Sequence, residues 1–249
     1  MGELTGYTSS MHLILFDIDG TLINGHGMGR LALERTFHEL FARSPETHPG
    51  VREVFFAGNT DRVIVAEMAV ALGIASAEFA ARRGEFDTAY LRHLRMTVAE
   101  TEGKIPCPGI PELLTRLKAN PAFHLGLVTG NIEPGARIKL DPFGLNPFFG
   151  WGGFGDESDR RVDLAALAWS RGREAAGTDI PAHAVALIGD TVPDIEAARA
   201  HGFLAVGVTT GWEPAEILTA AGADRVFPDL SPDHGFEAWL FERWGLPGG

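Results

Sequence analysis

Cysteine is nearly absent from this sequence, since Cys107 is the only one among 249 residues. A single thiol excludes an internal disulfide and a multi-cysteine zinc site, and it favours a reducing, cytoplasmic setting. The nine histidines show no metal-ligand spacing such as HExxH. The histidines, such as His26, His38 and His93, are therefore expected to be surface or helix-packing residues.

Long apolar segments are absent as well. The longest apolar-rich run, residues 63–75, is interrupted by Glu67 and is shorter than the roughly 20 residues that span a bilayer. The first ten residues lack the basic start and the apolar core of a signal peptide. The sequence therefore predicts neither a transmembrane segment nor an export signal.

Positive charge is in deficit, because 21 lysines and arginines face 33 aspartates and glutamates and the formal net charge is −12. This balance disfavours nonspecific binding to nucleic acid or to an anionic membrane. The expected partner is a small molecule, and an anionic one would need a locally positive site, with a metal ion as one source of that charge. The oligomeric state is left open.

The most informative segment is an apolar run, residues 13–16, that ends in two carboxylates. Asp17 and Asp19 follow the run, and Gly20 then lets the chain turn away. Four apolar residues without polar alternation fit a parallel strand that is covered on both faces. Because ligands bind beyond the carboxyl ends of such strands, both aspartates are expected in a ligand site.

Two further apolar runs end in polar residues, and helical segments separate them. Residues 125–128 end at Thr129, and residues 184–188 end at Gly189 and Asp190. Alternating helix and strand predicts an α/β fold with a Rossmann-like, doubly wound parallel sheet. The other elements predicted for this core are helices over residues 111–119, 164–176, 194–200 and 214–220, and strands over residues 204–208 and 225–227.

Residues 25–105 break this alternation, because they carry helical spacing with little strand character. We predict that they form a helical cap domain inserted into a core made of residues 1–24 and 106–249. Residues 58–61 are expected either to reach the active site or only to cap a helix. The helices predicted for the cap cover residues 29–41, 61–72 and 78–100, and the hinges predicted for it are residues 25–29 and 106–109.

Three motifs resemble, in order and spacing, those of the haloacid dehalogenase superfamily of hydrolases. They are Asp17-Ile18-Asp19-Gly20-Thr21, Thr129-Gly130-Asn131 and Gly189-Asp190-Thr191-Val192-Pro193-Asp194. The helical insertion after the first motif resembles the cap of the phosphoglycolate phosphatase-like branch. The resemblance implies a Mg²⁺-dependent enzyme that hydrolyses a small phosphorylated metabolite, a phosphomonoester such as phosphoglycolate or a sugar phosphate, through an aspartyl-phosphate.

The resemblance also implies a role for each aspartate. Asp17 is the implied nucleophile, and Asp19 is the implied acid that protonates the leaving alkoxide and the base that later activates water. The implied Mg²⁺ ligands are the carboxylates of Asp17 and Asp190 and the backbone carbonyl of Asp19. Asp194 and Thr21 are implied to orient this site without binding the metal or the phosphate themselves.

The implied phosphate ligands are the Thr129 hydroxyl and the backbone N–H groups of Gly130 and Asn131. The family's usual basic residue is a lysine followed by proline, and this chain departs from that pattern, because no lysine lies between Lys139 and Asp190. Arg160 and Arg161 are the two candidates. We favour Arg161, whose spacing to Leu164 fits a family member that uses arginine.

Two alternative functions stay open. A phosphosugar mutase of the same superfamily shares every core motif, and a phosphate-binding regulatory module would use the same residues without turnover. Asp19 argues against a dehalogenase, which typically lacks the second aspartate. A phosphonatase would need a lysine in the cap to form an imine, and the cap has none before Lys104.

Overall fold

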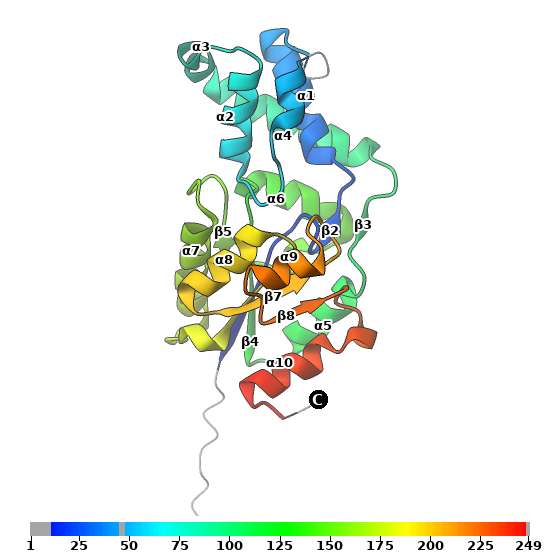
Figure 1. Cartoon of the computed structure of the whole chain (residues 1–249), viewed down its shortest axis with the longest axis vertical. Coiled ribbons are helices and arrows are strands. Elements are labelled where there is room, and N and C mark those ends of the chain that lie inside the picture. Colours follow the sequence, from blue (N-terminus) through cyan, green and yellow to red (C-terminus); the bar gives the residue numbers. More distant parts are fainter. Residues whose placement is uncertain (1–10, 45–47, 248–249) are drawn as a thin grey trace, which may run out of the picture.

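The structure is a computed structural model that describes residues 11–44 and 48–247. Within these residues, six parallel strands form one sheet in the order β5-β4-β1-β6-β7-β8 (Figure 1). The predicted Rossmann-like, doubly wound α/β fold is confirmed. The strands are β1 (His12–Phe16), β4 (Phe123–Val128), β5 (Gly152–Gly153), β6 (Val185–Gly189), β7 (Leu204–Val208) and β8 (Arg225–Phe227).

The central strand β1 is buried along its whole length, which explains its unbroken apolar sequence. It pairs with β4 on one side and with β6 on the other. Leu13 and Leu15 pack into the hydrophobic cluster on one face of the sheet, and Ile14 and Phe16 pack into the cluster on the other face. Both faces of β1 are thus covered, as the absence of polar alternation predicts.

Helices form a layer on each face of the sheet. The layer over Leu13 and Leu15 contains α7 (Arg161–Ala176), α8 (Val192–His201) and α9 (Ala215–Ala220). The opposite layer contains α5 (Ile110–Ala119), α6 (Glu133–Leu140) and α10 (Phe236–Trp244). The predicted core helices are confirmed close to their predicted bounds, whereas α6 and α10 were not predicted.

No helix in the described part of the chain combines the length and the apolar character needed to cross a membrane.

A second group of helices lies beyond one end of the sheet (Figure 1). The chain leaves the core through β2 (Ile23–Asn24) and returns through β3 (Ile105–Pro106), and these two short strands pair antiparallel. Between them lie α1 (Met28–Phe41), α2 (Asp61–Ala71), α3 (Ser76–Ala81) and α4 (Arg83–Glu100), which together are called the helical unit below.

Two of the three helices predicted for the helical unit are confirmed, and the third prediction, over residues 78–100, is corrected to two helices divided at Arg82. Arg82 lies between the two helices, and its φ of −111° departs from helical geometry. Phe37 on α1 packs against Phe79 on α3 and Phe86 on α4. This aromatic contact joins α1, α3 and α4, and Phe37 and Phe86 belong to the same hydrophobic cluster as Ile14 and Phe16 of the sheet.

Candidate active site

The three sequence motifs meet at the carboxyl edge of the sheet, because they follow the neighbouring strands β4, β1 and β6. A cavity of about 460 Å³ lies at this edge. Core residues and residues of the helical unit both line the cavity, so the site is built from two parts of the chain. The lining includes Asp17, Asp19, Thr129, Asn131, Lys139 and Arg161 from the core, and Gly58, Asn59 and Asp61 from the helical unit.

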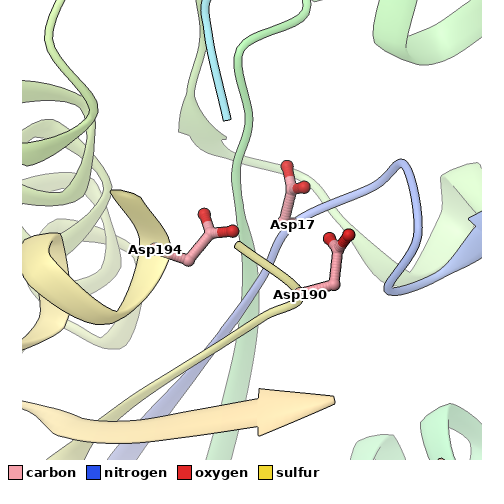
Figure 2. A group of neighbouring side chains, drawn as sticks. All are labelled: Asp17, Asp190 and Asp194. Carbon is pink, nitrogen blue, oxygen red and sulfur yellow. The ribbon is translucent and has the colours of Figure 1, made fainter. Parts of the chain in front are cut away.

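Three buried aspartates lie close together at this site, and of the three only Asp17 lines the cavity. Asp17 follows β1, Asp190 follows β6, and Asp194 lies in the first turn of α8 (Figure 2). Each offers a carboxylate oxygen, and these oxygens all lie within 4.8 Å of one another. Asp190 is fixed at both oxygens, since Oδ1 accepts from the Thr21 hydroxyl at 3.2 Å and Oδ2 accepts from the backbone N–H of Trp212 at 3.0 Å.

The start of α8 fixes the position of Asp194. Thr191 is the N-cap, and its hydroxyl donates to Asp194 Oδ2 at 2.6 Å within a capping box. Gly189 is required nearby, because a Cβ at that position would lie 2.3 Å from Asp194. The other oxygen, Asp194 Oδ1, lies 3.3 Å from the Nε of Arg161. Asp194 therefore contacts the basic residue Arg161 and also lies close to the carboxylates of the predicted metal site, the two groups that it was predicted to orient as alternatives.

Arg161 enters the site and Arg160 does not. Arg161 begins α7 with only 7% of its surface exposed, and its guanidinium donates to Asp17 Oδ1 at 3.0 Å and to the Val128 carbonyl at 3.1 Å. The side chain of Arg160 is 74% exposed and lies 3.8 Å from Asp163. Of the two candidates, only Arg161 is therefore in position to bind a phosphate beside Asp17.

Burial dominates the electrostatics of the aspartates. It raises the pKa of Asp17 to about 7, with Arg161 opposing the rise and the charges of Asp194 and Asp19 adding to it. Burial, followed by the charges of Asp17 and Asp194, raises the pKa of Asp190 well above its ordinary value. The carboxylates of Asp17, Asp190 and Asp194 thus lie near one buried guanidinium, that of Arg161. A divalent cation fits this set, because hard cations prefer carboxylate oxygens and would offset the remaining negative charge.

The predicted phosphate-binding segment follows β4 and is in contact with the helical unit. The Thr129 hydroxyl accepts from Asn131 Nδ2 at 2.8 Å, and the Gly130 carbonyl accepts from the backbone N–H of Asp61 at 2.7 Å. A Cβ on Gly130 would lie 2.2 Å from the Asn59 carbonyl oxygen. Glycine is therefore required where the helical unit approaches this segment.

Residues 58–61 fulfil both of the roles that the sequence left open. The Thr60 hydroxyl accepts from the backbone N–H of Val63 at 3.4 Å and caps α2. Asp61 reaches the core, where its Oδ2 accepts from the backbone N–H of Ile132 at 3.0 Å. Burial raises the pKa of Asp61 to about 6, although the charge of Lys139 opposes the rise.

Lys139 is a site residue that the sequence analysis missed. It lies on α6 with 5% of its surface exposed, and its Nζ lies 2.7 Å from Asp19 Oδ2. Asn131 Nδ2 donates to the same oxygen at 2.8 Å. Burial acts to raise the pKa of Asp19, but Lys139 and Asn131 hold it below its ordinary value. The sequence does contain a lysine soon after the second motif, but the helix that carries it was not predicted, so its place in the site could not be inferred.

Comparison with known proteins identifies the family. The family model for haloacid dehalogenase-like hydrolases matches residues 11–202. A phosphoglycolate phosphatase of Pseudomonas putida is 30% identical over 224 residues, which cover 88% of this chain and 76% of that protein. A phosphoglycolate phosphatase of Aquifex aeolicus is 29% identical over 197 residues, covering 77% and 82%.

Solved structures share the fold at lower identity. The CbbY protein of Rhodobacter sphaeroides, solved in complex with phosphate, aligns with a TM-score of 0.67 and 20% identity over 91% of this chain and 98% of its own. A β-phosphoglucomutase of Clostridium difficile aligns with a TM-score of 0.66 and 16% identity, covering 94% and 97%. With the matched family model, these comparisons show that the chain belongs to the haloacid dehalogenase-like hydrolase family. Within this family it is a phosphatase.

The buried carboxyl of Asp61 leads to a pH-dependent prediction. Because its pKa is raised to about 6 in the folded protein, the folded state binds a proton more readily than the unfolded state does. The wild type should therefore lose stability as the pH rises from about 4 through about 6. Asp61→Asn keeps an oxygen acceptor for Ile132 and removes this loss. Its free energy of unfolding, measured by urea denaturation, should rise relative to the wild type by about 1–2 kcal/mol across this interval.

The control for this measurement is Asp87→Asn, which removes a carboxylate that forms an exposed ion pair on α4. A difference between Asp61→Asn and the wild type that stays constant from pH 4 to pH 8 would contradict the raised pKa of Asp61.

Proposed function

We propose that this phosphatase is a Mg²⁺-dependent phosphohydrolase that cleaves a small phosphomonoester through an aspartyl-phosphate on Asp17. One observation carries the proposal: Asp17 lines the cavity, pairs with the Arg161 guanidinium at 3.0 Å and lies within 4.8 Å of carboxylate oxygens of Asp190 and Asp194. A nucleophilic carboxylate needs such a setting, in which positive groups bind the phosphate that it attacks. The first substrate to test is phosphoglycolate, because the curated relatives are phosphoglycolate phosphatases.

The nucleophilic step uses groups at the ends of three strands. An Asp17 oxygen attacks phosphorus in line with the leaving oxygen, while Arg161 and the Thr129 hydroxyl hold the phosphoryl oxygens. The proposed metal ligands are the carboxylates of Asp17 and Asp190 and the backbone carbonyl of Asp19. When bound, Mg²⁺ would offset the repulsion between the phosphate and the carboxylates.

Asp19 is the proposed acid and base. In the first step its carboxyl gives a proton to the departing alkoxide, and in the second step its carboxylate takes a proton from the water that attacks the phosphorus of the aspartyl-phosphate. Asp19 is placed for both transfers, because it lines the cavity with 39% of its side chain exposed and follows Asp17 by two positions. Its lowered pKa favours the carboxylate that serves as the base, so the acid step requires that Asp19 take up a proton before the leaving group departs.

We also propose that residues 25–105 act as a cap domain on a core formed by residues 1–24 and 106–249. The approach of Asn59 and Asp61 to Gly130 supports the cap role, because there the helical unit touches the proposed phosphate-binding segment. Closure would exclude water from the cavity and complete the substrate pocket. The proposed hinges lie next to the β2 and β3 strands, at residues 25–29 and 106–109.

The proposed function is tested by phosphate release from a panel of phosphomonoesters that includes phosphoglycolate and sugar phosphates. Release should require Mg²⁺, stop with EDTA and fall by about a thousandfold or more in Asp17→Asn, because the nucleophile is lost. Asp179→Asn, at a side chain that is 84% exposed, is the matched control and should keep wild-type activity. Release that persists in Asp17→Asn would contradict the proposal. A bisphosphorylated sugar that is isomerised faster than it is hydrolysed would instead favour the phosphosugar mutase.

Two adjacent arginines give an internal comparison. Arg161→Ala should lower kcat/KM by about a hundredfold or more, because it removes a buried charge that binds the phosphate in the transition state. Arg160→Ala should change kcat/KM by less than about twofold, because the exposed Arg160 side chain lies outside the site. Steady-state kinetics with the best substrate of the panel measures both effects. Equal losses in the two variants would refute the assignment of Arg161.

A further inference from the structure

We propose that Lys139 is a positioning residue for Asp19, which it fixes in the orientation needed for proton transfer to the leaving group. The inference rests on the proposed function, since it concerns the acid role of Asp19. Neither the sequence motifs nor the comparisons assign a role to Lys139.

The contacts of Asp19 distinguish its two carboxylate oxygens. Oδ2 is held by Lys139 Nζ at 2.7 Å and by Asn131 Nδ2 at 2.8 Å. Within the described residues, no hydrogen bond to Oδ1 is present, and Asp19 lines the cavity. With Oδ2 bound by two donors, the carboxylate cannot rotate freely, and Oδ1 is the oxygen left for the substrate. A proton-transfer group gains most from such fixation, because an error of about 1 Å in its position can cost about a hundredfold in rate.

The surroundings of Lys139 are adapted to this contact. Lysine is rarely buried unless it is paired, and the side chain of Lys139 is only 7% exposed. Gly29, at the start of α1, leaves room for it, because a Cβ at that position would lie 3.2 Å from Nζ. Lys139 and Asn131 both belong to the segment that connects β4 to the end of α6. The same segment therefore carries Thr129, the proposed phosphate ligand, and the two donors that hold Oδ2 of Asp19.

A direct role of Lys139 in phosphate binding is the competing explanation, and the leaving group separates the two. An alkoxide needs a proton as it departs, whereas 4-nitrophenolate is stable enough to leave without one. A residue that positions the acid therefore affects alkyl phosphates selectively. A residue that binds the phosphate affects alkyl and aryl phosphates alike.

The test compares Lys139→Met with the wild type on two esters, the best alkyl phosphate of the panel and 4-nitrophenyl phosphate. The quantity measured is kcat/KM, which reports the steps up to the aspartyl-phosphate and so isolates the departure of the leaving group. For the alkyl ester it should fall by about 10- to 100-fold, and for the aryl ester by less than about threefold. The ratio of the two values does not depend on the folded fraction of the preparation, so the result stands even if the variant folds poorly.

Three further single variants and one double variant complete the design. Lys139→Arg keeps a cation near Asp19 and should restore most of the alkyl activity, while Lys118→Met, at an exposed lysine on α5, should match the wild type. Asp19→Asn should show the same selective loss for the alkyl ester. Combining it with Lys139→Met should add no further selective loss, because the two residues act as one unit.

An equal fall for both esters in Lys139→Met would overturn the positioning role while leaving the proposed function intact. A wild type that hydrolyses neither ester would overturn the proposed function and this inference with it.

Discussion

The arrangement of a single buried guanidinium among three buried carboxylates governs the architecture of the site. Arg161 contacts Asp17 and Asp194, and Asp190 lies within the same group. Burying charges is costly even when they are paired, so stability does not explain this cluster. The cluster places the carboxylate of Asp17, the proposed nucleophile, beside a cation in the lining of a cavity. The fold supplies the rigidity needed to hold these charges together.

Neighbouring parallel strands hold these residues close together. The ends of β4, β1 and β6 lie side by side, so short segments after them bring Thr129, Asp17 and Asp190 together from distant parts of the sequence. Local structure then sets each side chain. The capping box at Thr191 fixes Asp194, and the backbone N–H of Trp212 fixes Asp190. The helical unit contributes Asp61, which contacts the backbone of Gly130 in the predicted phosphate-binding segment and of Ile132 just after it.

The parts of the fold that the sequence predicts are those in which burial dictates residue type. β1 is covered on both faces, and its apolar run therefore marks both the strand and the position of Asp17 at its end. By contrast, α6 begins with Glu133-Pro134-Gly135, which obscures its helical pattern although proline is tolerated in a first turn. The ion pair between Lys139 and Asp19 spans 120 positions, and no local pattern reveals it. Arg160 and Arg161 are adjacent and identical in type, so the sequence could favour Arg161 only through its spacing to Leu164. Their difference in burial, with Arg161 buried and Arg160 exposed, comes from the structure.

The most direct test of the account is to identify the residue that carries the phosphoryl group during turnover. Rapid quenching followed by borohydride reduction converts an acyl phosphate into an alcohol, which peptide mass spectrometry can locate. If Asp17 carries the phosphoryl group, homoserine is expected at position 17, and only when substrate and Mg²⁺ are both present. Phosphate release without any modified aspartate, or with the modification at Asp19, would contradict it.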